Sequence, residues 1–371
     1  MIYLDNAAST MVRPEVAAEM APYTGPEYSN PSSPHRGGRR ARRAVEAARR
    51  EVAALVGARP SEIIFTSGGT ESDNMAVRGA PPGPVTTTSI EHEAVLEPCR
   101  ARGDARYVAP DGAGMVGIRD VIDASAGSAL VSVMAANNEV GTIQPVREMA
   151  AGCGLFHTDA VQAAGKIPLD VGDLGVDMLS ISSHKIHGPK GAGALYVREG
   201  TAVGPLVLGG GQEGGMRSGT ENVAAIVGFG AACRIAREGM ASDMGRVRRM
   251  RDELARRALE IPGSRINGDP GRVLPGFLHM TFLGVDGEDL VVKLDENGVA
   301  ASTGSACSVN SQKASHVLEA MGFSHEEISG SLRMTLSPLN TMEDVEGAAA
   351  ALARVVPELR AVSPFSEKYG L

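Results

Sequence analysis

A lysine stands where a strand is expected to end. Lys185 follows the apolar run 176–181 and precedes a second one, 192–197. An isolated buried ammonium is costly and readily loses its proton, so a lysine here is either paired with an acid or retained for its amine. Only six of the 36 basic residues are lysines. Because arginine cannot deprotonate in a protein, the choice of lysine predicts a site that needs a neutral amine.

Two further patterns suit the same chemistry. Asp159 ends the apolar run 155–159, and the small-residue turn 67–70 follows the run 63–66 and leads into an expected helix. A helix N-terminus after such a turn offers N–H groups and a positive dipole end to an anion. Alone, the aspartate reads as a helix cap and the turn as an ordinary capped turn. Together, an amine, a carboxylate and an anion site are what pyridoxal 5'-phosphate requires.

These residues need a sheet to bring them together. Short apolar, β-rich runs alternate with segments of helical periodicity, which indicates an α/β domain with a largely parallel sheet covered on both faces. Ligands of such sheets bind at the carboxyl ends of the strands, so Lys185 and Asp159 are expected at one edge. The runs are 63–66, 85–89, 129–134, 155–159, 178–182 and 194–197.

The helical patterns suggest two lobes. One covers 36–56, with Gly57 as its stop, and another covers 223–259, which is long enough to link two lobes. From residue 263 onward the elements are shorter and predict a smaller α+β lobe: strands at 279–282 and 333–336, and helices at 315–321 and 342–355.

Composition excludes several classes of protein. The net charge of -8 argues against a dedicated nucleic-acid binder, and the arginine-rich stretch 36–50 reads as a solvated helix face. Four cysteines without a C-x-x-C pair predict neither a disulfide framework nor a metal site. No run approaches the roughly 18 apolar residues of a membrane span. The N-terminus lacks the features of a signal peptide, so we expect a cytoplasmic protein.

The chain also resembles a known family over nearly its whole length. Its motifs, in family order, resemble those of the cysteine desulfurases, in class V of the pyridoxal-phosphate enzymes of fold type I. They are YLDNAAST (3–10), NPSSPH (30–35), TSGGTESDN (66–74), EHEAVLE (91–97), VSVMAANNEVGTIQP (131–145), HTDAVQAAGKIPLD (157–170), SHKIHGPKGAGALYVR (183–198), GGGQEGGMRSGTEN (209–222) and STGSACS (302–308).

The resemblance implies a fold of two domains. The large one, residues 14–250, would bind the cofactor on a mainly parallel seven-stranded sheet between helices. Residues 1–13 and 251–371 would form a small α+β domain that carries a catalytic cysteine loop.

The resemblance also implies roles for residues around the cofactor ring. Lys185 would hold pyridoxal 5'-phosphate as a Schiff base and serve as the base that removes the α-proton. Asp159 would bind the pyridine nitrogen and Gln162 the phenolic oxygen. His92 would stack on the ring and carry a proton at the substrate thiol.

Phosphate and substrate contacts follow in the same way. The phosphate would be bound by Gly69, Thr70, Ser182 and His184, and by Thr220 of a second subunit, so the expected unit is a homodimer. Asn138 and Arg333 would bind the substrate carboxylate, for which the two-pronged guanidinium is suited. Cys307 lies in the small-residue loop 302–308, where a thiolate has access to the cofactor. The other cysteines are expected to be structural: Cys99, Cys153 and Cys233.

The implied activity is removal of sulfur from L-cysteine, giving L-alanine and a persulfide on Cys307 that passes to an acceptor protein. A selenocysteine lyase would share nearly all of these residues and is the first alternative. A dedicated sulfur donor to a nucleic-acid or natural-product thiolation system, docked through residues 36–50, is the second. Nothing in the residues identifies the sulfur acceptor, and nucleic acid as a direct ligand is disfavoured.

Overall fold

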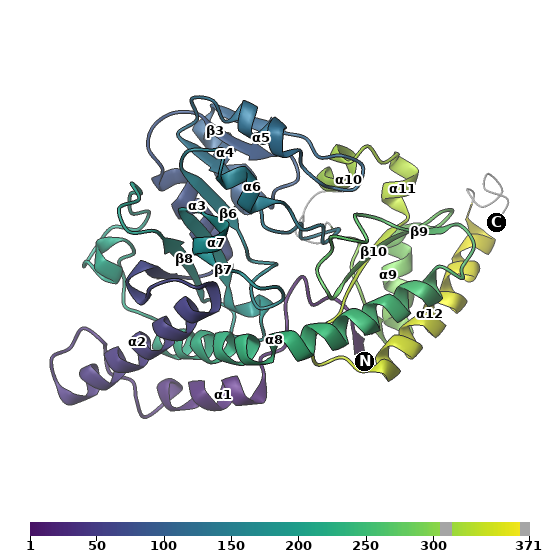
Figure 1. Ribbon diagram of the computed structural model, residues 1–371. Helices are drawn as coiled ribbons and strands as arrows, with labels where there is room; N and C mark the ends of the chain where they lie inside the picture. Colours follow the sequence, from purple (N-terminus) through teal and green to yellow (C-terminus); the bar gives the residue numbers. More distant parts are fainter. Residues whose placement is uncertain (305–313, 364–371) are drawn as a thin grey trace.

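The computed structural model describes residues 1–304 and 314–363. A seven-stranded sheet forms the centre of the larger lobe (Figure 1). Strand β8 runs antiparallel to both of its neighbours, and every other pairing in the sheet is parallel. In spatial order the strands are β2 (Ile63–Thr66), β8 (Gly193–Val197), β7 (Met178–Ser182), β6 (Phe156–Asp159), β5 (Leu130–Ser132), β3 (Val85–Thr88) and β4 (Ala105–Val108). The predicted α/β class and the seven-stranded, mainly parallel sheet are confirmed.

Strand β4 is the one strand of this sheet that the apolar runs did not predict. It lies at the edge and pairs only with β3. Arg106 and Tyr107 are exposed, and only Val108 is buried. Because an edge strand partly faces solvent, its sequence lacks the continuous apolar run that identifies the central strands.

Helices cover both faces of the sheet, and the side chains alternate between two cores. Ile64, Met178 and Leu195 point to the core beneath α3 (Gly69–Gly79) and α4 (Glu93–Arg102). Their neighbours Phe65, Leu179 and Tyr196 point to the opposite core, with α2 (Arg36–Val56) and α8 (Val223–Ala258). This alternation follows from the two-residue period of a strand.

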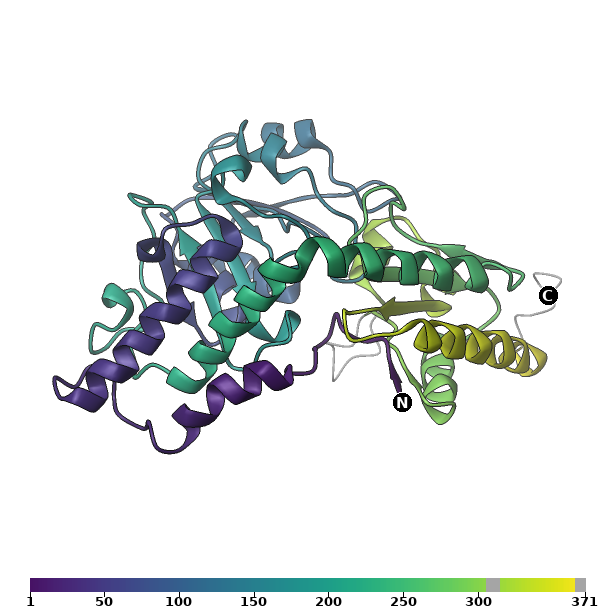
Figure 2. The same ribbon diagram turned by 60° about the horizontal axis from the view of Figure 1, so that its bottom comes forward.

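The helix layer on the α2 side is best seen in Figure 2, where α1 (Pro14–Met20), α2 and the first half of α8 lie side by side. Helix α2 has the predicted bounds, and Gly57 ends it in a left-handed conformation (φ 70°) that favours glycine. The remaining helices of this lobe are α5 (Ile118–Ala124), α6 (Val146–Ala150) and α7 (Val171–Leu174); single 3₁₀ turns cover Ala21–Thr24, Pro60–Glu62, Ser183–Lys185 and Glu213–Gly215.

Helix α8 is one continuous helix of 36 residues that runs from the first lobe into the second (Figures 1 and 2). The second lobe has its own core, around a three-stranded antiparallel sheet of β12 (Ser331–Thr335), β10 (Phe277–Phe282) and β9 (Ser264–Ile266). Its helices are α9 (Gly287–Glu296), α10 (His316–Ala320), α11 (His325–Ser329) and α12 (Met342–Val362). The predicted smaller α+β lobe is present; the exact domain boundaries stay predictions.

The N-terminus belongs to this second lobe. Strand β1 (Ile2–Tyr3) pairs in parallel with β11 (Val299–Ala300), and Leu4 packs in the second core. The chain then passes from the small lobe toward the end of β7, where Thr10 N–H donates to the carbonyl oxygen of His184 at 2.9 Å. The first ten residues therefore join the two lobes beside Lys185.

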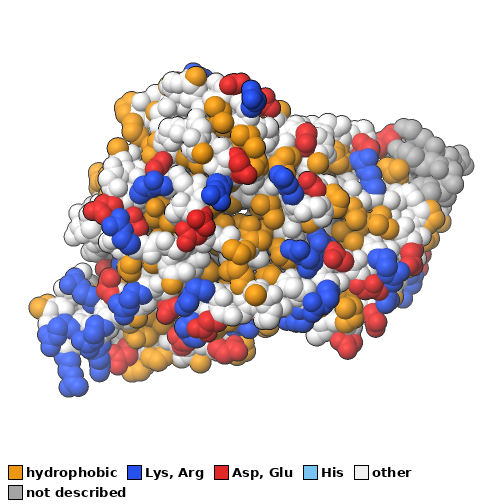
Figure 3. Space-filling view, in the orientation of Figure 1, with side chains coloured by type: hydrophobic (Ala, Val, Ile, Leu, Met, Phe, Trp, Pro, Cys, Tyr) orange, Lys and Arg blue, Asp and Glu red, His pale blue; other side chains and the backbone are white. Residues whose placement is uncertain are grey.

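Two surface features bear on the expected classes. In the described part of the chain, none of the helices has the length and apolarity needed to cross a bilayer. Arginine side chains gather over the start of α2, at the lower left of Figure 3. The exposed members of this group are Arg36, Arg39, Arg40, Arg42 and Arg43, and Arg40 pairs with Glu27 at 2.8 Å.

Candidate active site

Lys185 and Asp159 meet at one edge of the sheet. Strands β6 and β7 run parallel with Asp159 opposite Ser180, and both end within two residues of this pair. A single 3₁₀ turn, Ser183–Lys185, then places the lysine beyond the edge. Burial raises the pKa of the Asp159 carboxyl to about 6, while the N–H of Val161 and the charge of Lys185 oppose that rise. Asp159 is therefore mostly ionised at neutral pH, as a partner for a pyridinium must be.

The N-terminal segment covers the lysine. The amine of Lys185 donates to the carbonyl oxygens of Ala7 and, at 2.9 Å, of Ala8. Gln162, buried just after β6, donates through Nε2 to the same Ala7 oxygen at 3.0 Å. Lys185 and Gln162, predicted to contact one cofactor, thus converge on one carbonyl group.

The start of α3 forms a cradle for an anion. No side chain caps this helix, whose first residue is Gly69 and whose N-cap is Gly68. Ser182 lies beside it: a Cβ built on Gly69 would be 3.7 Å from the Ser182 Cβ and only 2.7 Å from the Val161 Cγ2. Within the described ranges, the buried Ser182 Oγ has no hydrogen-bond partner. Uncapped N–H groups beside an unpartnered buried hydroxyl fit a phosphate group.

The remaining phosphate candidates lie in two places. Thr70 is the second residue of α3, and His184 precedes the lysine, with its ring in contact with the Ser9 hydroxyl at 3.3 Å. Burial, together with the charge of Lys185, lowers the pKa of His184 to about 4, so this ring is neutral. Thr220 lies exposed, outside this cluster within the single chain.

The loop that carries Thr220 is fixed by two ion pairs. Glu213 accepts from the Arg49 guanidinium at 2.7 and 2.8 Å and from the Phe65 N–H at 2.9 Å. Arg217 binds Glu71 at 2.8 Å. These pairs hold the loop against its own subunit, while Thr220 in the same loop is exposed.

His92 is the N-cap of α4, and its Nδ1 accepts from the Ala94 N–H at 3.1 Å. A neutral ring that accepts at Nδ1 carries its proton on Nε2. Burial, and then the charge of Lys185, lowers the pKa of His92 to about 4. The His92 ring is therefore neutral and carries its proton on Nε2, where it can donate. It lies near enough to Lys185 for the lysine charge to lower its pKa.

Arg333 and Asn138 are in direct contact. Arg333 Nη1 donates to the Asn138 carbonyl oxygen at 2.8 Å and to the Gly304 carbonyl oxygen at 3.3 Å, and Nη2 binds Asp5 at 2.9 Å. Among the residues described, the Arg333 Nε and the Asn138 Oδ1 are buried without partners. Two residues predicted to bind one carboxylate therefore adjoin and retain unsatisfied polar atoms.

Cys307 lies outside the described residues, but both flanks of its segment are anchored. Gly304 receives the bond from Arg333, and Ser315 donates from its hydroxyl to the buried carboxylate of Glu139. Glu139 directly follows Asn138. The segment between Gly304 and Ser315 thus starts and ends beside the candidate substrate-binding pair.

Sequence reasoning missed several residues of this region. His316, at the start of α10, contacts the Glu91 carbonyl oxygen through Nε2 at 3.0 Å, and its charge helps to lower the pKa of His92. Beneath Asp159, His157 is held by Ser132 and Ser180 at 2.8 and 2.9 Å. The one sequence signal for residues of this region was membership of the quoted family motifs, which contain His157 and Glu91.

The ionisable side chains beneath Asp159 are shifted toward their neutral forms. Burial lowers the pKa of His157 to about 3. Asp73, 3.6 Å from the His157 Nε2, has its pKa raised by burial and by the charge of Asp159. Burial likewise raises the pKa of Glu91 to about 8. The shift of Asp159, to about 6, is smaller than that of Glu91, so Asp159 ionises more readily than Glu91 at this edge of the sheet.

The described residues fit pyridoxal 5'-phosphate. A buried carboxylate, a lysine amine beyond the sheet edge and an uncapped helix with an unpartnered hydroxyl lie together. This is the donor set that the cofactor's pyridine nitrogen, aldehyde and phosphate require.

Comparisons with known proteins support this assignment. The model of the aminotransferase class-V family matches residues 2–347. A cysteine desulfurase IscS from Dictyoglomus turgidum is 43% identical over 99% of this chain and 98% of its own length. A solved NifS-like protein is 37% identical, with a TM-score of 0.90, over 96% of this chain and all of that one. The structure of SspA in complex with cysteine is 34% identical, with a TM-score of 0.80, over 92% of this chain and all of that one.

The chain belongs to the class-V aminotransferase family of pyridoxal-phosphate enzymes. Within that family it is one of the cysteine desulfurases, the group its motifs resemble. The roles of individual residues, the subunit arrangement and the sulfur acceptor are proposals.

Proposed function

We propose that this chain removes sulfur from L-cysteine, releases L-alanine and holds the sulfur as a persulfide on Cys307 for an acceptor protein. The observation that carries the proposal is the meeting of the Lys185 amine and the buried Asp159 carboxylate beside the cradle at the start of α3. A relative is named a cysteine desulfurase, and the related SspA has been solved with cysteine.

The cofactor is held by groups already in place. When bound, pyridoxal 5'-phosphate withdraws electrons from the substrate's α-carbon and so makes the α-proton acidic. Lys185 would hold its aldehyde carbon, Asp159 its pyridine nitrogen and Gln162 its phenolic oxygen, and His92 would lie against the ring. The phosphate would be held by Gly69, Thr70, Ser182, His184 and the Thr220 of a second subunit.

Arg333 and Asn138 orient the substrate. Asp5 and two carbonyl groups occupy the outer nitrogens of the guanidinium and fix its plane, which leaves Nε for the substrate carboxylate. Asn138 adds an amide from the adjoining chain. A guanidinium fixed in this way loses little freedom on binding, which favours affinity for the carboxylate.

Lys185 and His92 move the protons. The Lys185 amine would take the α-proton from the substrate. His92 holds its proton on Nε2 at neutral pH and presents that proton beside the substrate thiol. A base and a neutral donor thus face one substrate from different elements.

Cys307 accepts the sulfur. Its thiolate attacks the substrate sulfur, so that an S–S bond forms while the substrate's C–S bond breaks. The electron pair of the C–S bond stays with the carbon skeleton, which takes up a proton at Cβ, regains the α-proton from Lys185 and leaves as alanine. One cysteine and one enzyme thiol thereby give one alanine and one persulfide, with no external oxidant or reductant.

A homodimer would complete the site. Thr220 is exposed on a loop held by the Arg49–Glu213 and Arg217–Glu71 pairs, where a second subunit could be reached. Sedimentation should give twice the chain mass of 38.4 kDa. A monomer with full activity would remove Thr220 from the site.

Replacing Cys307 tests the sulfur transfer. Cys307→Ala should release no alanine or sulfide from L-cysteine, yet keep the visible absorbance of the bound cofactor. Cys153→Ala is the matched control, because Cys153 lies in the other lobe and should not alter turnover. Full desulfuration by Cys307→Ala contradicts the proposal.

A further inference from the structure

Lys166 is a second lysine close to the candidate site and has no role in the mechanism above. It follows β6 by seven positions and lies partly buried. Its Nζ donates to the Gln162 Oε1 at 3.2 Å and lies 5.5 Å from the centroid of the Phe277 ring. Phe277 belongs to the second lobe, so Lys166 sits where the two lobes meet.

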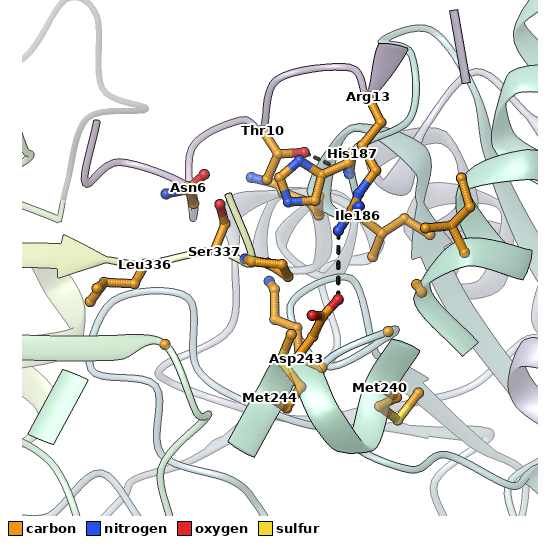
Figure 4. A pocket seen from close by; sticks show the side chains of 17 residues that line it. Asn6, Thr10, Arg13, Ile186, His187, Met240, Asp243, Met244, Leu336 and Ser337 are labelled. Atoms are coloured by element: carbon orange, nitrogen blue, oxygen red, sulfur yellow. Dashed lines mark hydrogen bonds and ion pairs between the residues drawn. The ribbon is translucent and has the colours of Figure 1, made fainter. Parts of the chain in front are cut away.

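Lys166 and Lys185 line the same small cavity, of about 40 Å³, between the two lobes. Figure 4 shows other side chains of its wall, among them Thr10, Arg13 and His187. Arg13 and Asp243 close one side of this cavity as an ion pair at 3.6 Å. Next to them, the Thr10 hydroxyl accepts a hydrogen bond from the His187 N–H. Other wall residues, such as Met240, Met244 and Leu336, are apolar. An ammonium in this setting is poorly solvated, and its hydrogen bond to Gln162 is correspondingly important.

We propose that Lys166 is a positioning residue for the cofactor: it fixes the side-chain amide of Gln162 so that the Nε2 end faces Ala7 and the cofactor's phenolic oxygen. The inference rests on the proposed function, because it takes the cofactor contact of Gln162 from there.

Hydrogen-bond chemistry determines the amide orientation. Lys166 is the donor in its hydrogen bond to Gln162. The atom of Gln162 that accepts this bond must therefore be the amide oxygen, Oε1. The other end is then Nε2, which donates to the Ala7 carbonyl oxygen at 3.0 Å. The same oxygen accepts from Lys185. Lys166, Gln162, Ala7 and Lys185 therefore form a chain of hydrogen bonds in which each partner's donor and acceptor are assigned.

The charge of Lys166 acts in the same direction. Burial, then the charges of Lys185 and Arg333, lowers the pKa of Lys166 to about 7. Repulsion between two amines is mutual, so a positive charge on Lys166 opposes a positive charge on the Lys185 nitrogen. A donor held toward the phenolic oxygen also makes that oxygen less basic. Both effects favour the unprotonated form of the linkage between Lys185 and the cofactor. The other titratable groups around Lys166 are Arg13, His184, His187, Asp243 and Arg333.

A pH titration of the holoenzyme tests the proposal. The visible absorbance of the bound cofactor would be followed in the wild type and in Lys166→Met, Lys166→Arg and Lys190→Met. Lys166→Met should raise the titration midpoint by about half a pH unit or more, since it removes both a charge and a donor. Lys166→Arg, which keeps both, should return the midpoint toward that of the wild type. Lys190→Met, at an exposed position, should leave it unchanged.

Borohydride reduction followed by peptide mapping distinguishes a failure of the proposed function from a failure of the role proposed for Lys166. Cofactor absent from Lys185 in the wild type would overturn the proposed function itself. Cofactor on Lys185 in all four proteins, with the same midpoint in Lys166→Met as in the wild type, would overturn the role of Lys166 alone. If Lys166→Met does not fold, Lys166→Gln keeps a neutral donor, and an unchanged midpoint in that variant also overturns the charge effect.

Discussion

Arg333 donates to the backbone oxygen of Asn138 at 2.8 Å, although the two residues are 195 positions apart in the chain. Asn138 lies in the larger lobe after β5, and Arg333 lies in β12 of the smaller lobe. The substrate carboxylate is therefore expected at the contact between the lobes. Both flanks of the segment that carries Cys307 are held at the same contact.

Arg333→Lys should reduce kcat/KM for L-cysteine by about 100-fold, mostly through a higher KM, because an ammonium has three donors and, once bound to Asn138, Gly304 and Asp5, has none left for the substrate carboxylate. Arg248→Lys, at an exposed position of α8, is the matched control and should behave as the wild type. Steady-state assays of alanine release provide the measurement. An unchanged KM in Arg333→Lys would remove Arg333 from substrate binding.

The activity should show no titration of His92 between pH 6 and 8. Its pKa is lowered to about 4, so the ring stays neutral as the pH rises through this window. His92→Gln should lower kcat by about 100-fold. The shape of its pH–rate profile from pH 6 to 8 should nevertheless match that of the wild type. An inflection near pH 6.5 that disappears in His92→Gln would contradict the neutral ring.

Glu91→Gln should change how stability depends on pH. The pKa of Glu91 is raised from 4.5 to about 8 in the folded state, so the wild type loses stability as the pH rises from about 4.5 through 8. Glutamine resembles the protonated acid and has no such loss. Between pH 5 and 8, the variant should gain about 3.5 kcal/mol relative to the wild type, measured by urea unfolding of the holoenzyme. A difference that is constant with pH would show that Glu91 is ionised in the folded protein.

Arg49→Met should destabilise the protein by about 3 kcal/mol, because it leaves the buried carboxylate of Glu213 without its partner. The exposed Arg50→Met serves as the control and should cost less than about 0.5 kcal/mol. Thermal unfolding compares the two. Because the Arg49–Glu213 pair also fixes the loop of Thr220, Arg49→Met should in addition weaken the retention of the cofactor during dialysis. Retention equal to that of Arg50→Met would show that this loop does not contribute to cofactor binding.

The central strands and the lysine at the sheet edge were accessible from the sequence because burial on both faces imposes a continuous apolar run. Helix α2 was predicted to the residue, since its amphipathic pattern ends at a glycine that adopts a positive φ. Strand β4 escaped prediction because its solvent-facing residues are polar.

Lys166 and His316 escaped for a different reason. Lys166 acquires its setting from Phe277, which is more than a hundred residues away, and His316 from Glu91. Neither contact has a local signature: Lys166 lies in the quoted motif 157–170, but nothing near it in the sequence indicates Phe277, and a histidine at a helix start is an ordinary surface pattern. Only the packing of the two lobes brings these side chains to the site.

The central claim is that Cys307 carries the sulfur. The most direct measurement is mass spectrometry of the peptide that contains Cys307, after the holoenzyme has reacted with L-cysteine without an acceptor and its thiols have been alkylated. We expect one additional sulfur atom on Cys307, in step with the alanine formed in the first turnover, and none on Cys99, Cys153 or Cys233. Alanine formation with no added sulfur on Cys307 would contradict it.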